Sequence, residues 1–192
     1  MDKTQIYKII KRIWRFLVYD DSWASFAADA VLILLIGKFI LFPGLGMIFG
    51  TAFPVVAVVS GSMDHHDMEF QDWWEANKDQ YEQYNITQSD FEEYYLKNGF
   101  NKGDVLVIQG QPISELSAGD IIVYSVPQRS DPIIHRIVGT SEEYISTKGD
   151  ANPGQIGFEK TIPSERIHGK AILLLPYLGW IKVGFLQLFG LL

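Results

Sequence analysis

Hydroxyl groups are the candidate nucleophiles of this chain, because its 192 residues include no cysteine. Ser62 follows a short apolar run, mostly valine, at positions 55–59, and Gly61 stands directly before it. This pattern predicts a buried strand that brings the serine to the edge of a sheet. A serine hydroxyl becomes a nucleophile only beside a base. The absence of cysteine also excludes disulfides, Cys-ligated zinc and thiol chemistry.

An imidazole can serve as that base, since its ordinary pKa of about 6.5 suits proton transfer at neutral pH. Of the four histidines, His135 lies inside a predicted strand at 132–138. A hairpin to the next predicted strand, 144–148, would bring Asp150 to the same end as His135. Imidazole and carboxylate are the base and the orienting group of hydroxyl-nucleophile sites. These patterns do not place Ser62 beside the pair, and a histidine inside a strand can equally be a structural residue.

Three short motifs carry a resemblance to a known family. VVSGSM at 58–63, PIIHRIVG at 132–139 and TKGDAN at 147–152 follow one N-terminal apolar segment in this order. The ordered set resembles the type I signal peptidases of peptidase family S26. It is similar to the archaeal and endoplasmic-reticulum branch, in which histidine replaces the lysine base of the bacterial enzymes. The resemblance extends from the apolar segment to about Tyr177, apart from residues 64–98.

The resemblance implies a role for each matched residue. Ser62 would be the nucleophile and His135 the general base. Asp150 matches the acidic residue that follows Lys-Gly in the family, and it is expected to orient His135 or to stabilise its charged form. Ser60 matches a serine whose hydroxyl assists the oxyanion hole in bacterial relatives.

Two positions depart from the family pattern. Asp64 and His65 stand where the family has Glu-Pro, and Ile156 stands where a second Asp often follows the first. Glu159 is the candidate for a replacement acidic partner, but we do not predict that it takes this place.

The N-terminal part of the chain predicts a membrane anchor. Residues 22–63 include only two charges, Asp29 and Lys38. As a helix, residues 22–42 are long enough to cross a hydrocarbon core of about 30 Å, and no small-residue cleavage site follows, so we expect an uncleaved anchor. The basic residues within 1–21 predict a cytoplasmic N-terminus, with an amphipathic helix on the inner membrane surface. The chain after the anchor would then lie outside the cell.

Residues 64–98 hold the acidity of the chain. The net charge is -7, and this segment alone has ten acidic residues against two lysines. Ser89 followed by Glu92 resembles a capping box, and Asn85 opens a glycosylation sequon. Five aromatic residues share one face of a predicted helix, and this stripe is expected to dock the segment rather than to form a substrate groove. The stripe comprises Phe70, Trp73, Trp74, Tyr81 and Tyr84.

Beyond residue 100 the pattern changes to short strands separated by Gly-Asp pairs and prolines, in which Asp104 and Asp120 are expected to cap turns. The fold class is therefore predicted as mainly β, a signal-peptidase-like β-fold catalytic domain with an N-terminal transmembrane helix and an acidic helical insertion. The predicted organisation is a cytoplasmic amphipathic segment (1–21), a transmembrane anchor (22–42), an apolar loop and nucleophile strand (43–63), the acidic helical insertion (64–100), the β-rich catalytic domain (101–175) and an apolar C-terminal membrane-associated segment (176–192).

We therefore expect a membrane-bound serine endopeptidase that cleaves N-terminal signal peptides from exported preproteins on the outer face of the cell membrane. No cofactor or metal is expected, since His65 and His66 lie among acidic residues without the ligand spacing of a known metal site. The expected partners are the lipid bilayer, preproteins and, as a candidate, the protein-export translocon, whereas the acidic charge argues against nucleic acid. Two alternatives stay open: a membrane-tethered, non-catalytic β-module that binds extracellular partners, and a self-cleaving or processing protease with another substrate.

Overall fold

The protein is described by a computed structural model that covers residues 2–188 and 190. The chain divides into two compact units, Met1–Ile48 and Phe49–Leu192. The first unit is helical and begins with α1 (Lys3–Tyr19), which has no buried residue. The helix predicted within 1–21 is therefore present, and its apolar side chains remain exposed.

One continuous helix, Trp23–Phe49, is long and apolar enough to cross a membrane. Its parts are α2 (Trp23–Ile36), a π-helical turn (Gly37–Leu41) and α3 (Phe42–Phe49).

The prediction that the helix ends before Pro43 and gives way to a loop is wrong, because helical structure continues to Phe49. A proline inside a helix lacks the amide hydrogen and collides with the carbonyl four residues earlier. Here the Phe42 N–H bonds to the Gly37 oxygen, five residues back. This wider π-turn changes the register directly before the proline ring, so the helix is not broken.

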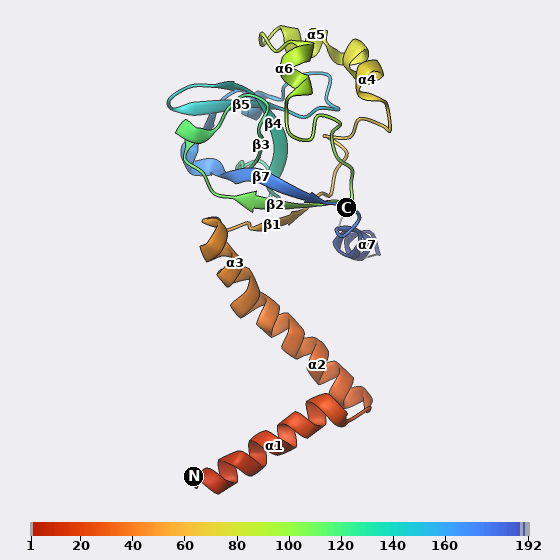
Figure 1. Ribbon diagram of the computed structural model, residues 1–192, viewed down its shortest axis with the longest axis vertical. Coiled ribbons are helices and arrows are strands. Elements are labelled where there is room, and N and C mark those ends of the chain that lie inside the picture. Colours follow the sequence, from red (N-terminus) through yellow and green to blue (C-terminus); the bar gives the residue numbers. More distant parts are fainter. Residues whose placement is uncertain (1, 189, 191–192) are drawn as a thin grey trace. The chain divides into compact units, whose positions relative to one another are not determined.

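The second unit is built on a curled sheet of seven antiparallel strands in the spatial order β1-β2-β7-β3-β4-β5-β6 (Figure 1). The central strand β3 is buried on both faces and separates two apolar clusters. This arrangement confirms the predicted β-fold and explains why β3 reads as an unbroken apolar run. The strands are β1 (Val55–Ala57), β2 (Val105–Gln109), β3 (Ile121–Tyr124), β4 (Ile133–Thr140), β5 (Tyr144–Lys148), β6 (Ile162–Pro163) and β7 (Ile167–Leu175).

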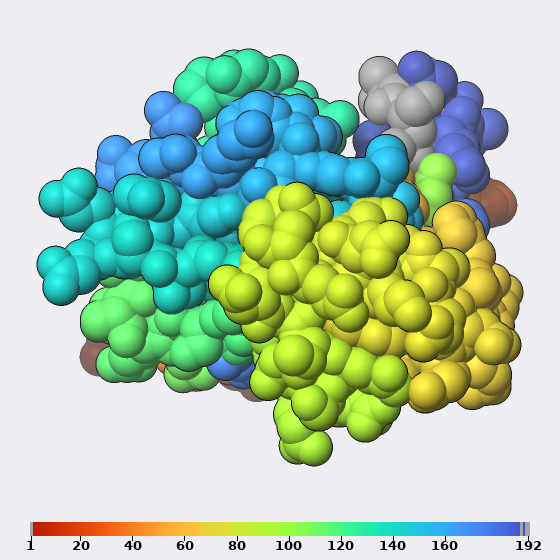
Figure 2. Space-filling model, turned by 90° about the horizontal axis from the view of Figure 1, so that it is seen from above, coloured from red at the N-terminus to blue at the C-terminus, as the bar shows by residue number. Residues whose placement is uncertain are grey.

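The acidic insertion joins β1 to β2 and covers part of one face of this unit, as the yellow and lime segments of Figure 2 show. It holds α4 (Phe70–Asn77), α5 (Asp79–Glu82) and α6 (Gln88–Glu92). The first two of these, α4 and α5, replace the single helix predicted for the aromatic stripe. The aromatic stripe gathers into one buried cluster that also includes Val138 of β4, which confirms that the stripe docks the insertion. The capping box lies two positions before the predicted pair of Ser89 and Glu92: Thr87 and Asp90 cap α6 reciprocally.

The C-terminal segment contains α7 (Trp180–Leu188), of which Val183 is buried and most other apolar side chains are exposed. Nine residues are about half of what a helix needs to cross a bilayer, so over its described length α7 is too short for a second span. Positions 189 and 191–192 of the predicted membrane-associated segment lie outside the described residues.

Candidate active site

Ser62 lies in the turn that follows β1, where its side chain is half-buried. The pairing of β1 continues past its last residue, since the Gly103 N–H donates to the Val58 oxygen at 2.9 Å. This pairing brings the chain to Ser60 and Ser62, whose hydroxyl oxygens lie 3.3 Å apart. The strand therefore presents both predicted serines side by side at the end of the sheet.

His135 lies on β4, opposite Ile122 of β3, and its ring is 4% exposed. Its Nδ1 atom bonds to the carboxylate of Glu159, which is fully buried. The second oxygen of Glu159 accepts the backbone N–H of Ile156, so the short 3₁₀ turn Gly157–Glu159 holds the carboxylate in place. The ring thus has its orienting partner on one nitrogen and leaves Nε2 for chemistry.

Ser60, Ser62 and His135 line one cleft of about 450 Å³. Residues 57–59, Phe100 and residues 128–134 form its other walls. Among the residues that the structure describes, no hydrogen bond joins the Ser62 hydroxyl to His135. Catalytic hydrogen bonds of this kind often tighten only when substrate is bound, so a shared cleft is the relevant geometry for an unliganded site.

Gly149 is required where it stands because serine and imidazole crowd its Cα. A Cβ atom at this position would lie 2.6 Å from Nδ2 of Asn152, 2.8 Å from Nε2 of His135 and 2.9 Å from the backbone oxygen of Ser62. The same carbonyl of Ser62 accepts the Ala151 N–H at 2.9 Å. The turn after β5 is therefore the element that brings the Ser62 segment and His135 together.

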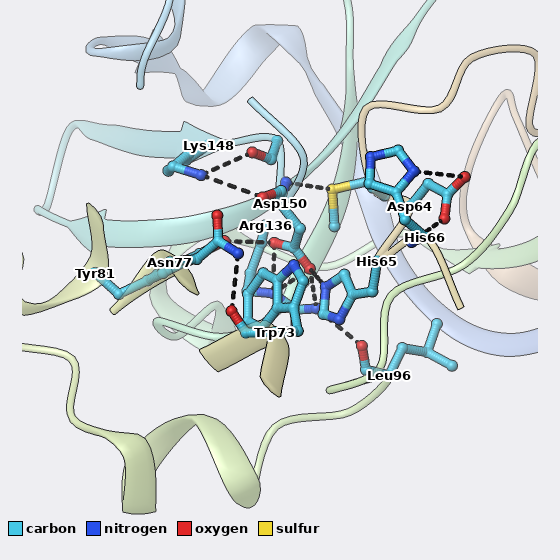
Figure 3. Close-up of polar contacts among 12 residues, drawn as sticks. Asp64, His65, His66, Trp73, Asn77, Tyr81, Leu96, Arg136, Lys148 and Asp150 are labelled. Atoms are coloured by element: carbon cyan, nitrogen blue, oxygen red, sulfur yellow. Dashed lines mark hydrogen bonds and ion pairs between the residues drawn. The ribbon is translucent and has the colours of Figure 1, made fainter. Parts of the chain in front are cut away.

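Among the described residues no hydrogen bond joins Asp150 to His135, so the predicted orienting contact is not formed. Its carboxylate accepts from Arg136 Nε at 3.0 Å and from Arg136 Nη2 at 2.7 Å. It also accepts the Tyr81 hydroxyl at 2.8 Å and bonds to His65 Nε2 at 3.1 Å (Figure 3). Alternation along a strand is the reason: His135 and Arg136 are neighbours on β4, so their side chains point to opposite faces. The carboxylate that reaches His135 is Glu159, which we did not predict for this role.

Charge complementarity stabilises the ionised form of Asp150 in the interior. Burial alone would raise the pKa of its carboxyl, but the Arg136 guanidinium and the hydrogen bonds from His65 and Arg136 outweigh burial and hold the pKa well below the usual range. Arg136 has no exposed surface. It also donates hydrogen bonds to the backbone oxygens of Tyr95, Leu96 and Gly119.

Lys148, at the end of β5, is a buried cation beside this pair. Its Nζ donates to the backbone oxygen of Gly149 at 2.9 Å and lies 4.7 Å from the centre of the Tyr81 ring. Burial lowers the pKa of Lys148 to about 8, against the opposing effect of Asp150. Lys148, Arg136 and Asp150 thus form one buried charged cluster behind the cleft.

Related sequences of known name cover most of the chain. It is 25% identical over 179 residues to the signal peptidase complex catalytic subunit SEC11 of Colletotrichum graminicola, a match that covers 83% of this chain and 85% of the relative. SEC11 of Neurospora crassa is also 25% identical over 179 residues, with the same coverage. SEC11 of Chaetomium globosum is 24% identical over 161 residues, covering 79% of this chain and 74% of the relative. The chain is related to signal peptidase catalytic subunits. No family model matches it.

This relationship confirms the resemblance that the three ordered motifs indicate. The sequence reasoning named Glu159 as a candidate replacement for the second Asp but did not predict that it takes this role; the missing second Asp at Ile156 is the signal that points to it. Glu159 lies nine positions after Asp150, and the loop between them turns back toward His135.

The other residues that the sequence analysis singled out are Asp104, Asp120 and His66, and their contacts are structural. Asp104 accepts the N–H groups of Asn101 and Tyr177, and Asp120 accepts that of Ser117, so both cap turns as predicted. His66 is exposed and contacts Asp64 rather than any second histidine. Within the described part of the chain there is no group of three or more His, Asp or Glu side chains that could hold a metal ion.

Proposed function

We propose that this protein is a membrane-bound signal peptidase, a serine endopeptidase that cleaves the signal peptides of exported preproteins. The observation that carries the proposal is the cleft shared by Ser60, Ser62 and His135, with Glu159 behind the imidazole. The relatives named SEC11 are catalytic subunits of signal peptidase complexes, which favours this activity over a non-catalytic binding module.

The chemistry follows from the arrangement of these four side chains. Ser62 Oγ attacks the scissile carbonyl carbon, and its proton moves to Nε2 of His135. The Glu159 carboxylate holds Nδ1–H and stabilises the imidazolium that forms. The backbone N–H of Ser62 and the Ser60 hydroxyl donate to the oxyanion. His135 then protonates the leaving amine, and water releases the acyl group from Ser62 by the same steps in reverse.

The substrate would bind as an extended segment along the cleft. β1 is an edge strand, and residues 57–60 and 132–134 face the cleft on its two sides. An extended peptide can pair its backbone with such a strand and place alternate side chains in pockets. The relationship to signal peptidases implies small side chains at the first and third positions before the cut.

The membrane arrangement of the protein supports the same function. The helix Trp23–Phe49 is the candidate span, and α1 carries Lys8, Lys11, Arg12 and Arg15 within one groove. Basic flanks stay on the cytoplasmic side of a membrane, so we place α1 on the cytoplasmic surface and the catalytic unit outside the cell membrane. The exposed apolar side chains of α7 would contact the lipid surface. A translocon or other membrane partners would supply the emerging preprotein.

Two variants test the proposal directly. Ser62→Ala and His135→Ala should each reduce cleavage of a model preprotein by about 10⁴-fold or more, because each removes a reacting group. Cleavage is measured with the purified full chain in detergent or liposomes, together with labelling of Ser62 by a serine-reactive probe. Retained cleavage in Ser62→Ala would refute the serine mechanism. His66→Ala is the matched control, since its exposed imidazole lies outside the cleft.

A further inference from the structure

Three parts of the acidic insertion converge on the Arg136–Asp150 pair. At its start, His65 bonds to Asp150 through Nε2 at 3.1 Å. In its middle, the Tyr81 hydroxyl donates to Asp150 at 2.8 Å. At its end, the backbone oxygens of Tyr95 and Leu96 accept from Arg136. The insertion is thus anchored on the two charged residues that adjoin the site.

His65 and Tyr81, the two side chains of the insertion that bond to Asp150, are buried and closely packed. The His65 ring stacks on Trp73 with their centres 3.7 Å apart and their planes 4° from parallel. Nδ1 of His65 is buried and has no hydrogen-bond partner in the described chain, so the ring hydrogen belongs on Nε2, where it donates to the carboxylate. Tyr81 has no exposed surface, and burial together with the neighbouring Asp150 charge raises the pKa of its phenol well above the usual value. Tyr81 therefore remains a neutral donor.

Asp150 also belongs to the turn that positions the nucleophile. Its backbone N–H points to the sulfur of Met63 at 3.4 Å, and the next N–H, of Ala151, donates to the Ser62 oxygen at 2.9 Å. On the other side of the pair, Arg136 directly follows His135 on β4. A displacement of the Asp150 carboxylate would therefore move both the Ser62 segment and the strand that carries the base.

We propose that the insertion is a working part of the catalytic scaffold, in which Tyr81 and His65 are positioning residues that hold the Asp150 turn against Ser62 and His135. Charge-assisted hydrogen bonds to a buried carboxylate are among the stronger ones in proteins. Reacting groups lose activity steeply when displaced, since a shift of about 1 Å can cost roughly 100-fold in rate. This inference rests on the proposed serine peptidase function.

Tyr81→Phe is the decisive variant because it removes only the hydroxyl. The ring remains under the Lys148 ammonium and within the aromatic cluster. Tyr84→Phe is the matched control: it makes the same chemical change in the same segment, where the Tyr84 hydroxyl has no hydrogen bond among the described residues. His65→Phe is the second test, since it keeps a ring for stacking on Trp73 and removes the donor to Asp150.

The experiment measures preprotein cleavage by the full chain in liposomes, with competent sites counted by a serine-reactive probe. We expect kcat per titrated site to fall about tenfold in Tyr81→Phe and His65→Phe, with KM within about twofold of the wild type and Tyr84→Phe unchanged. Thermal unfolding is followed in parallel. A Tyr81→Phe protein with wild-type kcat per site, whatever its melting temperature, would overturn the inference, and so would an equal loss in Tyr84→Phe.

The same assay distinguishes a failure of this inference from a failure of the proposed serine peptidase function on which it rests. A wild-type chain that neither cleaves preprotein nor reacts with the probe, or a Ser62→Ala chain that still cleaves, would remove the proposed function and the inference together. A wild type that is active and loses activity in Ser62→Ala, combined with a fully active Tyr81→Phe, would remove only the inference.

Discussion

Two neighbouring residues of β4 face two buried carboxylates on opposite sides of the strand. His135 bonds to Glu159 on the side of the cleft, and Arg136 bonds to Asp150 on the side of the insertion. Glu159 bonds to an imidazole, which can gain and lose a proton, whereas Asp150 neutralises a guanidinium, which always stays protonated. One pair is therefore suited to chemistry and the other to fixing the backbone.

The surroundings of the two pairs follow the same division. The cleft reaches His135, while Arg136 and Asp150 are covered by the insertion and have no exposed surface. A catalytic group must meet its substrate, but a buried ion pair is useful only where water cannot compete and every polar atom has a partner. The comparison predicts that variants on the two sides fail differently: those on the His135 side lose mainly rate, whereas those of the Arg136–Asp150 pair itself lose mainly stability, with a smaller loss of rate.

Glu159→Gln should give the largest effect that is confined to rate. The amide keeps the volume of the side chain but no longer stabilises the imidazolium or holds the correct tautomer, so we expect a loss of about 10³- to 10⁴-fold in kcat. Cleavage kinetics and urea unfolding of the full chain in detergent check this together. Wild-type activity in Glu159→Gln would contradict the role of Glu159.

Asp150→Asn should instead act on stability. The change leaves Arg136 buried without its counter-charge, which we expect to cost about 3–5 kcal/mol in the free energy of unfolding. Because the folded-state pKa of Asp150 is lowered, the wild type keeps this contribution above about pH 4 and loses it as the pH falls further, through the folded-state value. Asp150→Asn with normal stability and a rate loss like that of Glu159→Gln would restore Asp150 as the orienting group.

Gly149→Ala tests the comparison further, because Gly149 lies between the His135–Glu159 side and the Arg136–Asp150 side. A methyl group would collide with Nε2 of His135 and the Ser62 oxygen, so we expect a loss of about 100-fold in kcat/KM with the ion pair intact. The cleavage assay measures this loss, and Gly154→Ala serves as control, since nothing lies within 4 Å of its added Cβ. Equal activity of the two variants would show that the close approach at Gly149 is not required.

The smallest expected effect is a change of stability with pH, which arises from the buried charged cluster. The pKa of Lys148 is about 8 in the folded chain and about 10.4 when unfolded. Between these values the unfolded chain binds more protons, so stability should rise by about 2 kcal/mol from pH 8 to pH 10. Above pH 10 stability should fall, since burial raises the pKa of Tyr81. Urea titrations of wild type and Lys148→Met measure this, and an equal rise in the variant would exclude Lys148 as its source.

Much of the local structure could be predicted from residue patterns. The strands of the catalytic unit, the apolar helix after Ser22 and the docking of the aromatic stripe all follow from periodicity and composition. The helix past Pro43 could not, since it depends on a π-turn that shifts the register ahead of the ring.

The amino-acid sequence by itself determined the candidate nucleophile and base, because Ser62 and His135 stand in short ordered motifs whose strands are encoded locally. Only the tertiary structure decided which carboxylate bonds to His135 and which bonds to Arg136. Asp150 is closer to His135 along the chain, yet alternation on β4 turns His135 away from it and Arg136 toward it. The path of the loop from Asp150 to Glu159 is set by contacts with distant residues, and such contacts leave no periodic signal in the sequence.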